Sequence, residues 1–205
     1  MQLKKRQLAI VEAALRLTAS GGLGNLTVKK LAGELGVTEP ALYRHFLNKS
    51  EIVKAMIGSF ESVSDEVFVR IESEGVRGLS AVELFVKNRF QIVLKKPALS
   101  KVMFSEEQFI DEPEYSSLLL GMMHRHKENL CRMLREAQAD GTVRSDIRLE
   151  MMFRLIFGPV RLLIKQWGMS QQGFDLLKTG DEMWEDLRKI LSSGKERVGD
   201  EKTDH

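Results

Sequence analysis

TVKKLAGELGVTEPALYRHFLNK, residues 27–49, is the stretch of this chain that decides its fold. Thr27 is suited to cap a helix through its hydroxyl. An apolar stripe at helical spacing follows it, on Val28, Leu31, Ala32 and Leu35. Gly36 stands where a left-handed residue would end this helix, a conformation that glycine adopts without a Cβ penalty. The stretch therefore predicts a short helix that stops at a tight turn.

A second short helix is predicted directly after this turn. Thr38 is a suitable N-cap, and Pro40 fits the first helical turn because the N–H groups there lack intrahelical partners. Inward-facing Leu42 and Phe46 leave the intervening polar side chains outward or to the side. Two such helices form a helix-turn-helix, whose second helix docks in the major groove of DNA.

The same residues closely resemble the operator-binding motif of the tetracycline-repressor (TetR) family of transcriptional regulators. The resemblance is carried by Gly36-Val37-Thr38, Leu42-Tyr43-Arg44-His45-Phe46 and Lys49, at defined distances from one another. A Gly-Val turn alone would be weak support, since helical hairpins are common. The specific part of the resemblance covers residues 1–60, and the remainder matches only in length and helical layout.

The resemblance implies an all-α protein of about nine helices. A three-helix helix-turn-helix DNA-binding domain over residues 1–50 would precede a larger helical effector-binding and dimerisation domain over 51–192. An amphipathic helix over 6–20, with Ile10, Ala13, Ala14 and Leu17 on one face, would complete the first domain. The polar, charged tail over 193–205 is predicted to be disordered.

Helix start and stop signals recur in the second domain, and no alternating strand pattern persists. Capping boxes are expected at Asn48–Glu51 and Ser80–Glu83, and a further cap at Thr179–Glu182. With breaks at proline and glycine, these signals predict helices over about 49–74, 80–96, 97–109, 114–140, 147–168 and 179–191.

The charge of the chain is unevenly distributed. Residues 1–50 carry eight Lys and Arg against three Glu, a net charge of +5, while the whole chain carries +2 and the other residues therefore sum to −3. A basic excess on the segment with the motif is suited to a phosphate-binding surface, although charge alone would favour a merely solvated helical face.

Other functional classes find little support in the sequence. It has no Gly-rich phosphate loop, nucleophile elbow or HExxH motif, so we expect neither an enzyme nor a cofactor. Cys131 is the one cysteine, more typical of a small buried residue than of a redox switch. With no apparent signal peptide and no apolar run long enough to span a bilayer, we expect a cytoplasmic protein without membrane contact.

Eight residues are expected to contact double-stranded operator DNA: Lys29, Thr38, Glu39, Ala41, Tyr43, Arg44, His45 and Lys49. The resemblance implies phosphate contacts for Tyr43, His45 and Lys49, and a base contact for Lys29. The hydroxyl of Thr38, at the start of the helix, can also donate to phosphate.

The side chains expected to face the groove keep more than one interpretation. Glu39 can accept from a cytosine N4, or can be a solvated first-turn acid stabilised by the helix dipole. Ala41 can contact a thymine methyl group. Arg44 can reach phosphate or guanine, or only solvate the surface. The operator sequence does not follow from these residues.

The resemblance also implies a homodimer, in which the last two long helices of each subunit pair into a four-helix bundle. Candidate interface residues are Leu155, Pro159, Leu163, Trp167, Met183, Trp184 and Leu187, which would otherwise belong to the core of a monomer.

A small, lipophilic effector would bind in the second domain and release a repressor from a palindromic operator. Candidate lining residues are Phe104, Phe109, Met122, Met123, His126, Phe153 and Phe157, although large apolar side chains are more often core than pocket. His124 and His126, at i and i+2, do not share a helix face, so no metal site is expected. The alternative is a family member of the nucleoid-occlusion type, coupled to a protein partner instead of a small ligand.

Overall fold

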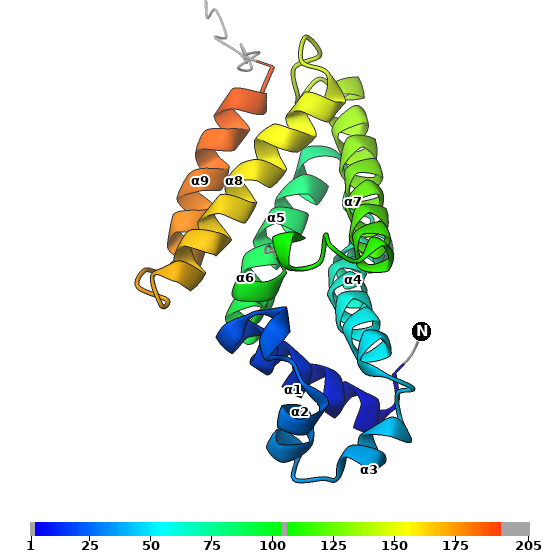
Figure 1. The fold of residues 1–205 in the computed structure, drawn as a ribbon. Helices are drawn as coiled ribbons and strands as arrows, with labels where there is room; N and C mark the ends of the chain where they lie inside the picture. The colour runs from blue at the N-terminus through cyan, green and yellow to red at the C-terminus, as the bar shows by residue number, and fades with distance from the viewer. Residues whose placement is uncertain (1–2, 104–105, 194–205) are drawn as a thin grey trace, which may run out of the picture.

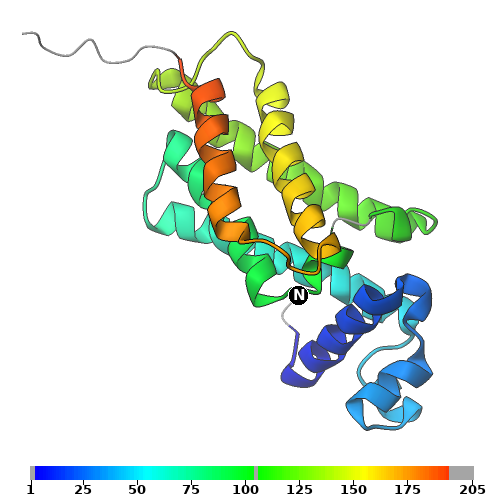
Figure 2. The same cartoon turned by 90° about the vertical axis from the view of Figure 1, so that its left-hand side faces the viewer.

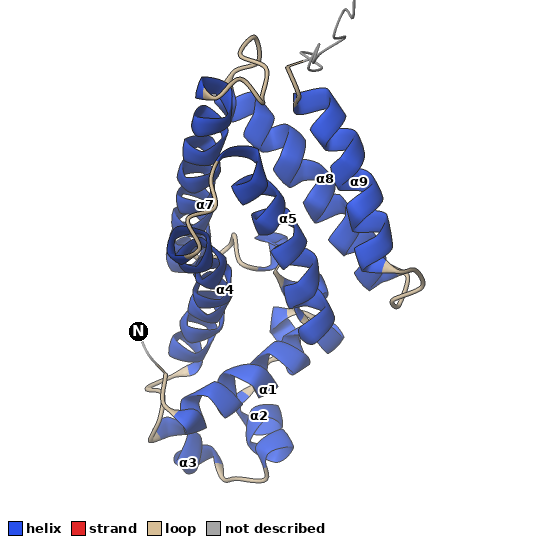
Figure 3. Ribbon diagram, turned by 180° about the vertical axis from the view of Figure 1, so that it is seen from behind, coloured by secondary structure: helices blue, strands red, loops and turns tan. Residues whose placement is uncertain are grey.

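The structure, a computed structural model, describes residues 3–103 and 106–193. These residues form nine α-helices and no strand, and one isolated bridge joins Val143 to Ser192. Figures 1 and 3 show how the helices are arranged. The prediction of an all-α fold is confirmed. Apart from Ser193, the tail predicted over 193–205 lies outside the described residues. No helix in the described part of the chain is long and apolar enough to cross a membrane.

The first three helices form one end of the molecule (Figure 1): α1 (Lys5–Gly21), α2 (Val28–Leu35) and α3 (Glu39–Tyr43), with a 3-10 turn, η1 (Leu23–Asn25), between the first two. The predicted inner face of α1 is buried at Ile10, Ala13 and Ala14, each 0% exposed. Leu31 of α2 and Leu42 of α3 are buried in the same core. These apolar contacts fix how the helix-turn-helix sits on α1.

The turn between α2 and α3 forms largely as its sequence predicts. The Thr27 hydroxyl accepts a hydrogen bond from Lys30 N at 3.2 Å, and Gly36 is left-handed with φ 64° and ψ 35°. Thr38, however, makes no side-chain cap. Pro40 has no N–H to offer it, and the Ala41 N–H donates to the Thr38 backbone carbonyl at 3.0 Å instead.

The second domain consists of six α-helices and a 3-10 turn: α4 (Lys49–Ser73), α5 (Gly78–Lys95), α6 (Leu99–Val102), η2 (Glu106–Gln108), α7 (Pro113–Ala139), α8 (Leu149–Met169) and α9 (Leu176–Leu191). The long α4 leads out of the first domain and packs against α1, α5 and α7. Helix α5 lies at the centre, in contact with α4, α7, α8 and α9. Figure 2 shows α8 and α9 side by side on one face.

Two predicted helix starts are wrong, since both helices begin upstream of the predicted caps. Helix α5 begins at Gly78 rather than at the Ser80–Glu83 box, and a Glu136 carboxylate oxygen of α7 accepts from the Gly78 N–H at 3.4 Å. Helix α9 begins at Leu176, not at Thr179, because Asp175 accepts from the N–H groups of residues 177 and 178, both at 3.0 Å.

The segment 97–109, predicted as one helix, is instead divided between α6 and η2, with residues 104–105 outside the described part. Helix α6 is short, but it packs on both α1 and α8. It approaches α8 closely, since a Cβ on Gly168 would lie 2.6 Å from the Ser100 Oγ. This short helix therefore joins the DNA-binding end to the rest of the molecule.

Candidate nucleic-acid interface and ligand cavity

The eight predicted DNA contacts lie on or beside the helix-turn-helix, and most of them are accessible. Six are exposed, and Ala41 and Lys49 are half-buried. Tyr43 is 45% exposed, so its ring is not a core aromatic with only its hydroxyl at the rim. Lys49 turns back toward the protein, and its Nζ lies 3.5 Å from the Leu23 carbonyl oxygen.

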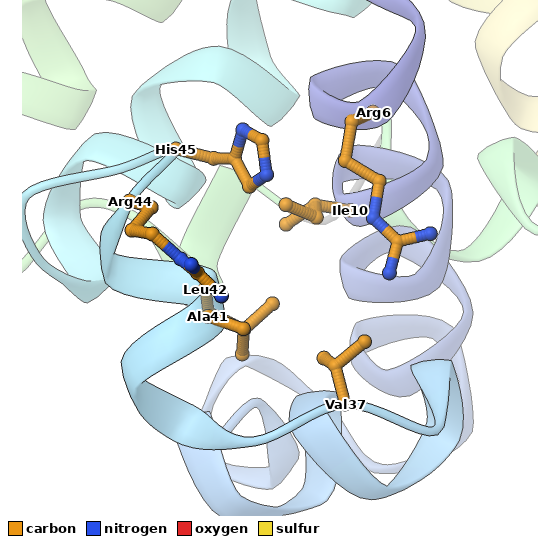
Figure 4. Close-up of a pocket in the computed structure, with 7 residues that line it drawn as sticks. All are labelled: Arg6, Ile10, Val37, Ala41, Leu42, Arg44 and His45. Carbon is orange, nitrogen blue, oxygen red and sulfur yellow. The ribbon is translucent and has the colours of Figure 1, made fainter.

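A cleft of about 420 Å³ opens between α1 and the turn that follows α3. Figure 4 shows Arg6 and Ile10 entering from α1, with Arg44 and His45 opposite. Sequence reasoning did not name Arg6 as a DNA contact. The signal was present in the basic run Lys4-Lys5-Arg6, which the charge count included without assigning it to the helix-turn-helix face. The folded chain thus places a cation of α1 opposite Arg44, which directly follows α3.

The ion pairs of this region leave its basic groups available. Arg16 pairs with Glu34 at 2.7 Å, and Glu12 pairs with Lys96, directly after α5, at 3.5 Å. Two of the three acids of residues 1–50 are therefore neutralised within the protein. In the described part of the chain, Lys29, Arg44 and His45 form no ion pair, so their hydrogen-bond donors face solvent.

Inside the second domain, a narrow cavity of about 20 Å³ lies among α5, α7 and α8. Its lining residues are Arg89, Met103, Met122, Met123, His126, Phe157 and Val160. Four predicted ligand contacts thus share one cavity, namely Met122, Met123, His126 and Phe157. Phe109 packs against Tyr115 and lines neither this cavity nor the outer cleft described below, and Phe104 lies outside the described residues.

The cavity contains a buried cation that the sequence reasoning missed. Arg89 is 3% exposed, and its Nη2 donates to the Ser64 carbonyl oxygen at 3.1 Å and to Asn88 Oδ1 at 2.7 Å. Its Nε and Nη1 have no hydrogen-bond partner within the described residues. The signal was a charge on an otherwise apolar helix face, between Phe85 and Val93. Burial lowers the pKa of Arg89 to about 9, so the side chain remains charged at neutral pH.

His126 lies beside the same aromatic ring as Arg89. The Arg89 Cζ is 4.5 Å from the Phe85 ring centroid, and the His126 ring is 6.0 Å from it in an edge-on arrangement. Burial, with help from Arg89 and Arg125, lowers the pKa of His126 to about 3. The imidazole is therefore neutral, and its Nε2 has no partner in the described part of the structure.

An outer cleft of about 540 Å³ between α7 and α8 adjoins this cavity. Met123 and Phe157 line both spaces, and Phe153 lines the outer one. The outer cleft also carries four basic side chains, His124, Lys127, Arg154 and Arg161. The inner cavity and the basic outer cleft thus share two lining side chains, Met123 and Phe157.

Four of the predicted interface residues are buried within a single subunit. Leu163, Trp167, Trp184 and Leu187 are between 1% and 9% exposed within a single subunit. Trp167 Nε1 donates to the Phe174 carbonyl oxygen at 3.1 Å, which holds it in the core of its own subunit. Both tryptophans were assigned outward because helical spacing alone does not say which apolar face meets the core. Leu155, Pro159 and Met183 are half-buried.

An apolar stripe remains on the outer face of α8. It consists of Met151, Leu155, Pro159, Leu162 and Met169, at spacings that place them on one side of the helix. Leu162 is 58% exposed and Met169 is 75% exposed. In the described residues, no group of three or more His, Cys, Asp or Glu side chains could hold a metal ion, and Cys131 is buried.

Comparison with known families gives two matches that follow one another along the chain. The family described as bacterial regulatory proteins, tetR family, matches residues 10–56, the segment that contains the helix-turn-helix. The family described as YsiA-like protein, C-terminal region, matches residues 81–189, more than half of the chain.

Relatives cover most of the chain at low identity. The probable acrEF/envCD operon repressor of Escherichia coli (strain K12) is 22% identical over 92% of this chain and 87% of the relative. The HTH-type transcriptional regulator TtgR of Pseudomonas putida is 28% identical over 86% of each. The nucleoid occlusion factor SlmA of Pasteurella multocida, also 28% identical, matches over only 54% of this chain and 56% of its own length.

Among solved structures, the fatty acid degradation regulator FadR from Bacillus halodurans superposes with a TM-score of 0.81. The alignment covers 92% of this chain and 97% of that one, at 18% identity. At this identity the likeness concerns the fold alone.

Proposed function

Because the chain belongs to the tetR family of bacterial regulatory proteins, a family of transcriptional regulators, we propose that it is a cytoplasmic, dimeric repressor that a small lipophilic ligand releases from a palindromic operator. The observation that carries this proposal is the exposed basic surface formed by α1 and the residues that directly follow α3. Its cations surround one cleft at the end of the molecule, and the acids beside them are largely paired elsewhere.

The proposed DNA contacts follow from this surface. Non-specific affinity comes from phosphate neutralisation, and Arg6, Tyr43, His45 and Lys49 supply donors suited to phosphate oxygens. Lys29, Glu39, Ala41 and Arg44 remain the candidates for base edges, while Thr38, whose hydroxyl does not cap the helix, is available to phosphate.

The proposed effector site is the cavity among α5, α7 and α8. Its walls are mainly methionine, phenylalanine and valine, and flexible methionine side chains can rearrange to enlarge a narrow space. An apolar interior of this kind favours a small ligand over the alternative of a protein partner. The nucleoid occlusion factor SlmA of Vibrio vulnificus matches 88% of this chain and 92% of its own length at 21% identity, so the comparisons alone do not decide against that alternative, and the apolar cavity is what favours the small ligand.

A short route leads from this cavity to the DNA-binding end. Met103, which lines the cavity, directly follows α6, and α6 packs on α1. Further contacts cross between the domains: Gln108 Oε1 accepts from Leu23 N at 3.0 Å, and the Tyr115 hydroxyl lies 3.1 Å from Ser50 Oγ. A ligand that displaced Met103 would therefore shift α6 against α1 and change the spacing of the two recognition helices.

We assign the dimer interface to the apolar stripe of α8, in place of the buried tryptophans. A self-complementary contact on this stripe would cover Leu162 and Met169, which a monomer leaves in water. Leu162→Glu should convert the dimer to a monomer in analytical ultracentrifugation, because it would bury two unpaired carboxylates. Val69→Glu, at an equally exposed apolar position of α4, should leave the dimer intact. A dimer that survives Leu162→Glu would disprove this assignment.

In vitro selection of DNA fragments by the full-length protein tests the proposed function. We expect a palindrome whose half-sites lie about one helical turn, or a multiple of it, apart. Titration of that operator against a panel of lipophilic compounds should identify at least one that weakens binding tenfold or more. Unchanged operator affinity across the panel would refute the ligand switch, and failure to select any sequence would refute specific DNA binding.

A further inference from the structure

The fold alone does not explain why the charged side chain of Arg89 is buried without a carboxylate beside it. A buried guanidinium normally faces a carboxylate, because an uncompensated charge is costly to remove from water. Within the described residues, no carboxylate oxygen lies within 4.0 Å of its nitrogens. Asp65 acts on Arg89 only at longer range, and burial raises the pKa of that carboxyl group.

The hydrogen bonds that Arg89 does make leave most of its donors unused. Only Nη2 donates, to a helix carbonyl oxygen and to an amide oxygen, both of which are neutral. The N–H bonds of Nε and Nη1 remain without a described partner, beside a cavity that Arg89 lines. A space of about 20 Å³ holds roughly one water molecule, and a water would satisfy a donor without compensating the charge.

His126 lines the same cavity and adds a second unsatisfied group. Its Nε2 has no partner in the described structure, and the ring is 2% exposed. Because the imidazole is neutral, either ring nitrogen can carry the proton, and Nε2 can then donate to an anion beside Arg89. Both side chains contact the Phe85 ring, so their polar ends lie in the same part of the domain.

We propose that Arg89 and His126 form an inner anion subsite, which takes the carboxylate end of a ligand whose body is apolar. This inference rests on the proposed effector site and names the chemical class of its ligand. The carboxylate accepts from the unused N–H groups of Arg89 and from His126, while the apolar body lies among Met103, Met122 and Phe157. A ligand with a wholly apolar inner end would leave the buried charge uncompensated.

The outer cleft is suited to admit such a ligand to the inner cavity. His124, Arg154 and Arg161 line it, together with Lys127, which pairs with Glu150 at 2.6 Å, and Met123 and Phe157 line both spaces. Positive charge along the cleft raises the local concentration of an anion, and rotation of the two shared side chains would connect the two spaces. Attraction at the mouth and recognition at the inner end are distinct, and variants can separate them.

Binding measurements on the full-length protein at pH 7.5 test the subsite without any DNA. The probes are dodecanoate and 2-naphthoate, each paired with its uncharged amide, at concentrations below aggregation and measured by isothermal titration calorimetry. We expect the wild type to bind at least one carboxylate ten times or more tightly than its amide. Affinities equal within twofold for both pairs, or no binding of either carboxylate, would overturn the proposal.

Variants show which arginine is responsible for the preference for the carboxylate over its amide. Arg89→Gln should reduce the carboxylate preference to less than twofold, whereas Arg154→Gln, at an exposed position of the outer cleft, should keep at least a fivefold preference. A preference that persists in Arg89→Gln, or that Arg154→Gln abolishes equally, would disprove the inner subsite. Arg89→Met provides a second variant, which should melt at a higher temperature than the wild type because a buried unpaired charge is removed.

The same probes separate this inference from the proposed function. If a carboxylate binds with the expected preference and leaves operator affinity unchanged, the subsite stands and the ligand switch fails. If a neutral lipophilic compound releases the operator and no carboxylate is preferred, the switch stands and the subsite is wrong.

Discussion

The two ends of this molecule hold positive charge in opposite surroundings. At the DNA-binding end, Lys29 and Arg44 extend into water and form no ion pair with a described residue. In the second domain, Arg89 is buried among methionine and aromatic side chains, also without an ion pair. An exposed cation costs little free energy, and it can pair with any phosphate backbone. A buried cation costs much more free energy, and it can pair only with an anion that fits beside it. The first surface is therefore suited to a large and general partner, the second to a small and specific one.

The largest expected effect concerns the DNA-binding end of the molecule. Tyr43→Phe, Arg44→Ala and Lys49→Ala, combined in one variant, should weaken operator binding on the order of 10²- to 10³-fold, as expected for the loss of three hydrogen-bonded contacts. The slope of log affinity against log salt should also fall by about two, since two cations are lost. Fluorescence anisotropy at several salt concentrations measures both quantities.

Lys178→Ala provides the matched control, because it removes an exposed cation from α9, outside the helix-turn-helix. It should leave both affinity and salt slope unchanged. If the triple variant binds the operator as tightly as the control does, Tyr43, Arg44 and Lys49 are not the DNA contacts.

A smaller effect is expected for the buried histidine of the second domain, His126. The pKa of His126 is lowered to about 3 by burial and by its arginine neighbours, while in the unfolded chain it is near 6.5. The unfolded chain therefore binds the extra proton between these values, and stability falls as the pH falls below about 6.5. Between pH 7 and pH 5 we expect this one group to cost about 2 kcal/mol of unfolding free energy.

Urea unfolding at fixed protein concentration over this pH range checks the loss, with His126→Gln and His124→Gln as the variants. Removing the buried histidine should flatten the pH dependence by about that amount, while removing the exposed one should not. Equal slopes in the two variants would show that His126 is not held neutral by burial.

The smallest effect concerns the turn that orients the DNA-binding surface. Gly36 has a left-handed backbone with nothing within 4 Å of an added Cβ, so Gly36→Ala should cost about 1 kcal/mol through conformation alone. Gly33→Ala, inside α2 and equally free of contacts, should instead stabilise by about 0.5–1 kcal/mol. Thermal unfolding of the two variants should move Tm in opposite directions, and a shift of the same sign would contradict the turn geometry.

The sequence predicted the helix-turn-helix more fully than it predicted the second domain. The helix-turn-helix was accessible because its signals are local: a threonine cap, an apolar stripe and a left-handed glycine within a few residues of one another. The starts of α5 and α9 were not, because they depend on Glu136, which is distant in sequence, and on the choice between two nearby caps.

The second domain was less predictable because its chemistry depends on which apolar face meets which. Periodicity identified Trp167 and Trp184 as apolar surface, but only packing shows that both face inward, leaving Leu162 outside. Four of the proposed cavity residues could be named from composition, yet Arg89 was overlooked, since a lone charge on a helix is ordinarily solvated. Its burial is a property of the assembled domain.

In the proposed switch, occupation of the inner cavity controls the outer DNA-binding surface. The operator affinity of the wild type and of Arg89→Gln, each measured with and without the carboxylate probe that calorimetry finds the wild type to prefer, tests this coupling. We expect the probe to weaken operator binding of the wild type at least tenfold and that of Arg89→Gln less than twofold. Equal operator affinity of the wild type with and without bound probe would contradict it.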